Sequence, residues 1–400
     1  MALMDVVEKV YQAGNGLWQE VKQRDTWVYC VSRGNLPQQG GTLSVHYLGR
    51  KRFADDFLMF YDRDAIDAAV EQSITHTASL PQFLRERRQL TECPEGADVL
   101  IVDHLFERHL AGGPADLLAP HINGMLTVEP TIDAQMEAVR SKGHRRKLSQ
   151  ALKRGIRWRR THSLADFNLF YDVMYEPFVA DRFRYGASVV PRGDMQRMFV
   201  QRGFLLLVEE DNVPVSGGLI YTSRRHRDVM CYWKYGLAHS DQLSANVFGE
   251  RNAAQEACVL QYAVEHKFRH IDWGLTKAIP TDGIFAHKKR VGCDFQKTPN
   301  APDFRIHIHP RAQARFLSRF PLIVSRGGAL EGRVAYEPPA NARLGLKQLA
   351  ETLSAMSFPS LQSIRLLVPD GLQHDVALLA ACRQAGADGQ TPVALEARPA

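Results

Sequence analysis

The sequence predicts an α/β protein with a mixed, mainly antiparallel sheet, and three observations support this fold class. Apolar runs of strand length alternate with segments whose apolar residues recur at helical spacing. Three strand-like runs, at residues 204–210, 214–223 and 228–238, follow one another with only short turns between them, as in an antiparallel meander. With 400 residues, 45% of them hydrophobic, the chain is long enough for two domain cores and an extension.

The composition of the chain indicates which kinds of partner it binds and in which cellular compartment it is expected. Fifty Lys and Arg against 44 Asp and Glu give a formal charge of +6, which favours an anionic partner such as a phosphate, a nucleotide-bearing cofactor, nucleic acid or a membrane surface. The six cysteines form no CxxC pair, which argues against a disulfide framework and a structural zinc. We see neither a signal peptide nor a window of about 18 apolar residues. We therefore expect a cytoplasmic protein with no metal and no integral membrane association.

Residues 1–130 are predicted to form a first domain. Strands are expected at 26–32, 42–48 and 97–105, and helices at 62–73 and 80–90. The run ADVLIVDHL, which begins at Ala97, is apolar enough to be a buried central strand. This part of the chain contains no phosphate loop and no catalytic motif.

The chain becomes basic at Ser141. Between Ser141 and Arg160 there are nine Lys or Arg and no acidic residue. Apolar residues at helical spacing and a C-terminal Gly155 predict a surface helix here. Helices whose charge serves only solubility usually carry acidic partners four residues from the basic ones. Two interpretations therefore stay open, a solvated face and a surface that contacts an anion.

The elements that follow complete a second domain, predicted at residues 131–320. They are a strand at 156–161, helices at 164–180 and 194–202, the three-stranded meander, a long helix at 244–267 and a short buried strand at 270–274. A loop that carries a lysine pair comes next. The Gly-, Pro- and Ala-rich residues 321–345 are predicted to be a linker, and residues 346–400 a small helix–strand–helix extension.

Four segments resemble the Fem-type branch of the GNAT superfamily of N-acetyltransferases, which includes peptidoglycan-bridge aminoacyltransferases and exopolysaccharide-associated acyltransferases. The segments are SKGHRRKLSQALKRG, VPVSGGLIY, IDWG and GIFAHKKRVG. The resemblance covers residues 122–297 and is only architectural over residues 1–120. It implies two acetyltransferase-like folds in tandem, of which the second is active.

The resemblance also implies direct transfer of an acyl or aminoacyl group to an amine or hydroxyl. Such transfer needs a polarised carbonyl, a deprotonated nucleophile and a site for an anionic donor. In this family the carbonyl is held where two central strands splay apart. Here that place is expected near Tyr232, Trp233 and Tyr235, with Trp273 as a further pocket wall. Packing in the core remains the alternative for both tryptophans.

Lys288 is the first candidate for catalysis. The resemblance aligns it with a lysine that meets the donor ester or phosphate, and a cation beside a developing oxyanion lowers the barrier. The alternative is that Lys288 and Lys289 belong to an exposed basic turn. We assign Lys289 to donor binding. Asp272, at a strand end, has three open roles, which are to orient Lys288, to act as a base, or to cap the next loop.

The anionic part of the donor needs its own site. Arg145 and Arg146 are candidates because guanidinium pairs with phosphate through two hydrogen bonds. The N-terminus of the long helix, with Ser244 and Asn246, offers free N–H groups. The usual pyrophosphate loop is replaced there by HSDQLSANVFGERNA.

Three further histidines, His226, His239 and His287, have a spacing that forms no recognised metal-ligand set. We therefore expect no permanently bound cofactor, with the donor acting as co-substrate.

These observations predict an acyltransferase whose donor is an acyl thioester such as acyl-CoA. Its acceptor is an amine or hydroxyl of a small molecule or of a cell-envelope or polysaccharide precursor, nucleotide- or lipid-linked. Two alternatives stay open, a peptide-bond-forming enzyme that uses aminoacyl-tRNA and a catalytically inactive protein that binds an anionic ligand.

Overall fold

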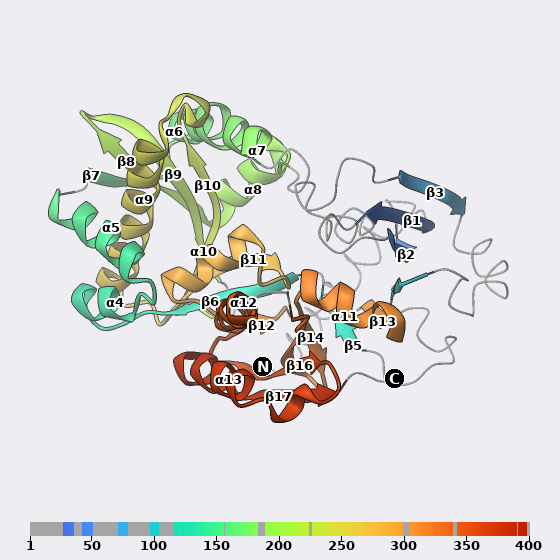
Figure 1. Cartoon of the computed structure of the whole chain (residues 1–400). Helices are drawn as coiled ribbons and strands as arrows, with labels where there is room; N and C mark the ends of the chain where they lie inside the picture. The colour runs from blue at the N-terminus through green and yellow to red at the C-terminus, as the bar shows by residue number, and fades with distance from the viewer. Residues whose placement is uncertain are drawn as a thin grey trace, which may run out of the picture.

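The computed structural model describes residues 27–35, 42–50, 71–78, 97–103, 116–119, 121–155, 157–182, 189–223, 226–298, 304–338, 342–389 and 391–397. Within these ranges the chain forms two mixed sheets with helices packed on them, which confirms the α/β class (Figure 1). The helix predicted at 80–90 lies outside the described residues. The one predicted at 62–73 falls mostly outside them, and its last three residues belong to strand β3 (Glu71–Ala78) instead.

The seven-stranded sheet contains the predicted meander. Its order is β12 (Asp294–Lys297), β6 (His121–Thr127), β11 (His270–Lys277), β10 (Val229–Leu237), β9 (Val213–Thr222), β8 (Gly203–Glu210) and β7 (Arg157–Thr161). Strands β8, β9 and β10 pair antiparallel in sequence order, as expected. The one parallel pair among these strands is β10 with β11, because the long helix α9 (Ala245–Glu265) connects them.

Helices cover both faces of this sheet. On one face α4 (Ile132–Ala138), α5 (Lys142–Lys153) and α9 enclose an apolar core with residues of β8, β10 and β11 (Figure 1). On the other face lie α6 (Leu164–Leu169), the π-helical turn η3 (Phe170–Tyr175), α7 (Glu176–Arg182) and α8 (Arg192–Arg202). The basic segment therefore forms a helix as predicted, with the Ser141 side chain accepting from the His144 N–H at 3.3 Å as its N-cap.

Strand β10 passes close to the π-helical turn, and this approach requires glycine at position 236. A Cβ atom on Gly236 would lie 2.7 Å from the backbone of Met174 and of Tyr175. We expect Gly236→Ala to lower the free energy of unfolding by about 1–3 kcal/mol, the range of an overpacked core. The matched control is Gly193→Ala on α8, where an added Cβ meets nothing within 4 Å. Equal denaturation midpoints for the two variants would contradict the close approach.

The ten-stranded sheet is assembled from both ends of the chain. Its order is β17 (Val393–Ala397), β16 (Leu361–Val368), β15 (Ala329–Ala335), β14 (Leu322–Arg326), β5 (Asp116–Leu118), β13 (Phe304–Ile308), β4 (Val99–Asp103), β2 (Thr42–Arg50), β1 (Trp27–Asn35) and β3. Strand β13 pairs with both β4 and β5. The chain therefore leaves this sheet after β5, builds the seven-stranded sheet, and returns at β13.

The linker prediction for residues 321–345 was wrong. This segment contains β14 and β15, which form an antiparallel hairpin around Gly327 and Gly328, both with positive φ. The glycines that suggested a linker are hairpin-turn residues. Strands β16 and β17 extend the same sheet in parallel from β15, with helices α12 (Ala342–Met356) and α13 (Val376–Gly389) packed on it. The predicted extension is therefore continuous with the ten-stranded sheet.

The boundary predicted at residue 130 also differs from the sheets. Strand β6 ends at Thr127, within the predicted first domain, yet it pairs with β11 and β12 in the seven-stranded sheet. The hydrophobic pattern of one strand does not reveal which sheet that strand will join. The tandem arrangement of two acetyltransferase-like folds remains a prediction.

Candidate functional site

The seven-stranded sheet opens between its parallel strands. Residues 229–231 of β10 pair with residues 270–272 of β11, and the ladder between the two strands ends there. Farther on, β10 continues along β9 as far as Leu237, and β11 continues along β6 as far as Lys277. We call the place where they separate, at Tyr232 and Trp273, the divergence point. Beyond it, this ladder no longer joins the backbone groups of the two strands.

Both strands are irregular at the divergence point. The register of β10 shifts between Tyr232 and Lys234, and that of β11 shifts between Asp272 and Leu275. Gly274 adopts φ +79°, a conformation that favours glycine. Its N–H donates to Asp272 Oδ1 at 2.9 Å. Of the three roles left open for Asp272, the structure therefore shows the one in which its carboxylate caps the following irregular turn.

Lys288 lies on a helix, so the loop prediction was wrong. Helix α10 (Gly283–Val291) begins at Asp282, whose carboxylate accepts from two backbone N–H groups at 3.0 Å, and ends at Gly292. These residues are ordinary helix start and stop signals. The Lys288 side chain is only 5% exposed, and its Nζ donates to the Gly274 and Leu275 carbonyl oxygens at 2.7 Å each. An exposed basic turn is therefore excluded for Lys288.

The Lys288 ammonium faces the divergence point. A Cβ atom on Gly274 would lie 3.9 Å from Lys288 Nζ and 3.9 Å from the Tyr232 carbonyl oxygen, so Gly274 lies close to both groups. Burial lowers the pKa of Lys288 to about 8, although Cys293, Asp272 and other acidic groups partly oppose this shift. Two of its three N–H donors go to the carbonyls, which leaves one donor and the positive charge for a ligand.

A second lysine near the divergence point, Lys234 on β10, was not predicted to be a site residue. Burial lowers its pKa, and its Nζ lies 5.5 Å from the centre of the Trp233 ring. Its charge also contributes to lowering the pKa of Lys288, so the two lysines lie within electrostatic reach of each other. A cation within the aromatic run CYWKY was the available sequence signal.

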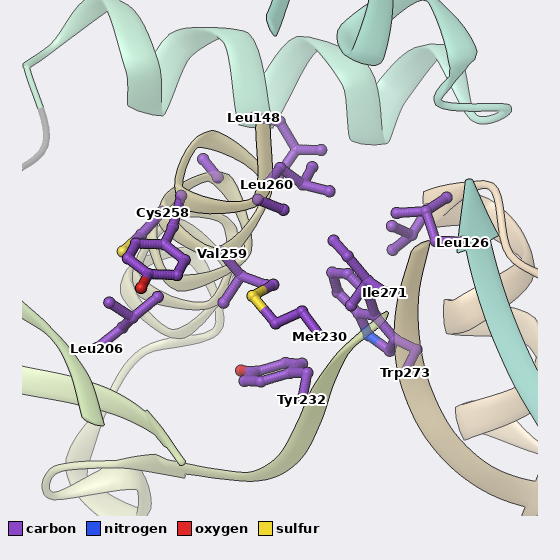
Figure 2. Close-up of a cluster of buried hydrophobic side chains, with 14 of the residues drawn as sticks. Leu126, Leu148, Leu206, Met230, Tyr232, Cys258, Val259, Leu260, Ile271 and Trp273 are labelled. Carbon is purple, nitrogen blue, oxygen red and sulfur yellow. The ribbon is translucent and has the colours of Figure 1, made fainter. Parts of the chain in front are cut away.

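The four aromatic candidates divide between the two faces of the sheet. Tyr232 and Trp273, 9% and 7% exposed, lie with their rings 5.3 Å apart in the core that also contains α9 residues (Figure 2). Trp233 and Tyr235 are half-buried and pack against the cluster on the opposite face, where the Tyr235 ring lies 5.2 Å from that of Phe178, but Tyr235 also packs against the first core. Packing therefore accounts for Tyr232 and Trp273, which close one face of the divergence point.

Two of the residues predicted to bind the acyl donor, Lys289 and Arg145, do not lie at the divergence point. Lys289 donates instead to the carbonyl oxygens of Ser354 and Ala355, near the C-terminus of α12, and burial lowers its pKa to about 8. Arg145 donates to the Val139 carbonyl at 3.1 Å, at the end of α4. Both contacts are typical of cations that satisfy free carbonyls at a helix C-terminus.

The other donor candidates lie near a separate groove between α5 and α9. Ser244 is the N-cap of α9, and its Oγ accepts from the Val247 N–H at 3.4 Å. Behind this first turn lies a pocket of about 130 Å³, which we call the α5–α9 groove. Its lining includes Arg146, Lys147, Gln150, Arg154, Asn246 and Glu250. The structure therefore brings Arg146 and Asn246 together.

A buried carboxylate with two histidines was also missed. Glu256 of α9 is 2% exposed, and its two oxygens lie 2.7 Å from His144 Nε2 on α5 and 2.9 Å from His287 Nε2 on α10. Burial alone would raise the pKa of this carboxyl, but the two histidines outweigh that effect and lower it to about 2. Glu256 is therefore ionised at neutral pH. We call these three residues the Glu256 cluster.

Among the described residues, no group of three or more His, Cys, Asp or Glu is arranged to hold a metal ion. In the same part of the chain, no helix combines the length and the apolar character needed to cross a membrane.

Comparisons with known proteins give structural matches only. No family model matches the chain, and no curated protein matches it. Among solved structures, FemX aligns with a TM-score of 0.38 and 13% identity over 73% of this chain and 87% of its own. L-PGS from Bacillus licheniformis aligns with a TM-score of 0.31 and 9% identity over 71% of this chain and 82% of its own. A GCN5-related N-acetyltransferase from Kribbella flavida aligns with a TM-score of 0.25 and 14% identity over 57% of this chain and 74% of its own.

Proposed function

We propose that this chain is an acyltransferase that moves an acyl group from an activated donor directly to an amine or hydroxyl. The supporting observation is the divergence of β10 and β11 beside the buried ammonium of Lys288. The proposed donor is an acyl thioester such as acyl-CoA. The proposed acceptor is a small molecule or a cell-envelope or polysaccharide precursor in the cytoplasm, nucleotide- or lipid-linked.

In this proposal the donor carbonyl lies between the separated strands. The nucleophile attacks the carbonyl carbon and forms the new C–N or C–O bond. The bond from that carbon to the donor sulfur or oxygen then breaks, and the nucleophile's proton passes to a base. Backbone N–H groups of β10 beyond Tyr232 and the Lys288 cation stabilise the oxyanion that develops on the carbonyl oxygen. Asp272 acts indirectly, because it holds the turn whose carbonyls position Lys288.

The α5–α9 groove supports a second candidate, in which the donor is aminoacyl-tRNA. Arg146 and Lys147 line this groove, and their charges suit the phosphates of a nucleic-acid backbone, whereas Arg154 pairs with Glu250 at 2.9 Å. The same surface supports a catalytically inactive protein that binds an anionic ligand. Transfer from a defined donor separates these three possibilities.

We expect labelled acyl groups to move from a panel of acyl-CoAs, tested beside a charged total tRNA pool, to an acceptor fraction from a cell extract. Label that moves only from tRNA would replace the first candidate by the second. In that case Arg146→Gln/Lys147→Gln should lower transfer, whereas the same variant should change thioester transfer little. No transfer from either donor, together with salt-sensitive binding of a polyanion, would favour the inactive binding protein.

A further inference from the structure

The Glu256 cluster connects the two helices that flank the divergence point. Helix α9 packs on β8, β9 and β10, and α10 packs on β11. The contact between Glu256 and His287 therefore joins the two sides of the opening. His144 approaches the same carboxylate from α5. His287 directly precedes Lys288 on α10, so the cluster and the proposed oxyanion site share one short helix.

The cluster and Lys288 also share an electrostatic environment. Burial raises the pKa of the Tyr232 phenol at the divergence point, and Glu256 adds to this shift. Burial also raises the pKa of the Cys293 thiol, where Lys288 opposes the shift and Glu256 adds to it. The titratable groups that interact electrostatically with Glu256 include His144 from α5, His287 from α10, Tyr232 from β10 and Cys293, which follows α10.

The ionised carboxylate fixes which nitrogen of His287 can accept a proton. An ionised Glu256 only accepts hydrogen bonds, so the Nε2 of a neutral His287 must carry the hydrogen. The lone pair then lies on Nδ1. A carboxylate that orients a histidine in this way holds it in the tautomer that a general base requires. The His287 side chain is 31% exposed, against 13% for His144, so His287 is the more accessible of the two.

We propose that His287, oriented by Glu256, accepts the proton of the acceptor nucleophile. This inference rests on the proposed function. As the amine or hydroxyl attacks, its proton moves to His287 Nδ1, and the imidazolium returns it to the departing sulfur or oxygen of the donor. No further reactant is needed. His144 contacts the same carboxylate from α5 but takes no part in the proton transfer.

The test compares His287→Gln with the matched control His144→Gln, since each replaces one histidine on the same carboxylate. We expect His287→Gln to lower kcat about 100-fold or more at pH 7, the usual contribution of a general base. His144→Gln should stay within about threefold of the wild-type rate. Equal rates for the two variants would overturn the proposal.

A measurement on the wild-type protein tests the proposal if His287→Gln does not fold. Diethyl pyrocarbonate acylates accessible imidazole nitrogens, and peptide mass spectrometry counts the modified residues. Loss of transfer should follow the modified fraction of His287, and full modification without loss would overturn the proposal. A wild-type protein that transfers from no donor would instead overturn the proposed function, and this inference with it.

Discussion

Lys288→Met is expected to lower transfer 100- to 1,000-fold while the protein stays folded. Removal of one stabilising donor from an oxyanion site has an effect of this size. Methionine keeps the length of the side chain but removes its charge and its N–H groups. The Gly274 and Leu275 carbonyls then lose their partner, so we also expect a decrease of about 1–3 kcal/mol in the free energy of unfolding. Steady-state transfer and circular dichroism measure the two effects separately.

The neighbouring Lys289→Met is the matched control. Lys289 also donates to two backbone carbonyls, and burial lowers its pKa to the same value of about 8, but its partners belong to α12. We expect a similar loss of stability with transfer within about twofold of wild type. If the two variants lost transfer equally, Lys288 would have a structural role only.

Transfer is also expected to fall about tenfold per pH unit above pH 8. Burial lowers the pKa of Lys288 from 10.5 to about 8, so the cation predominates below that pH and is lost above it. An arginine stays protonated throughout this range. Lys288→Arg should therefore remove the decline at high pH, whatever its rate at pH 7. The measurement is kcat/KM from pH 6 to 10 for both proteins, and a decline that persists in Lys288→Arg would contradict the assignment.

Unfolding would not explain this decline. Because the folded-state pKa of Lys288 lies below the ordinary value of 10.5, the unfolded chain binds more protons between pH 8 and 10.5. The contribution of this lysine to stability therefore rises with pH across that window. Lys289 contributes in the same direction. Circular dichroism at each pH should show an unchanged fold while transfer falls.

Elements with local signals could be predicted from the sequence. The strands β8, β9 and β10 follow from short apolar runs with turns between them, and their antiparallel order was predicted correctly. Helix α9 begins at Ser244 as expected because the cap and the first free N–H groups lie within three residues of each other. The same kinds of local signal, Asp282 and Gly292, mark the two ends of helix α10, although this segment is predicted from the sequence to be a loop.

The pairing of distant segments could not be predicted in this way. The local sequence of β14 and β15 does not identify their neighbouring strands, and the glycines of the Gly327–Gly328 turn suggested a linker. In the same way, the sequence presents Lys288 and Lys289 as one basic pair. The fold directs one to the turn in β11 and the other to α12.

The sequence by itself determined the fold class, the meander, the basic helix and the importance of Lys288 as a candidate. Only the tertiary structure decided that Lys288 is buried, that Lys289 caps another helix, and that Glu256 lies between two histidines. The physical reason is range. Capping and periodicity depend on residues a few positions apart, whereas His144 and Glu256 are 112 residues apart and meet only because α5 and α9 pack on one face of the sheet.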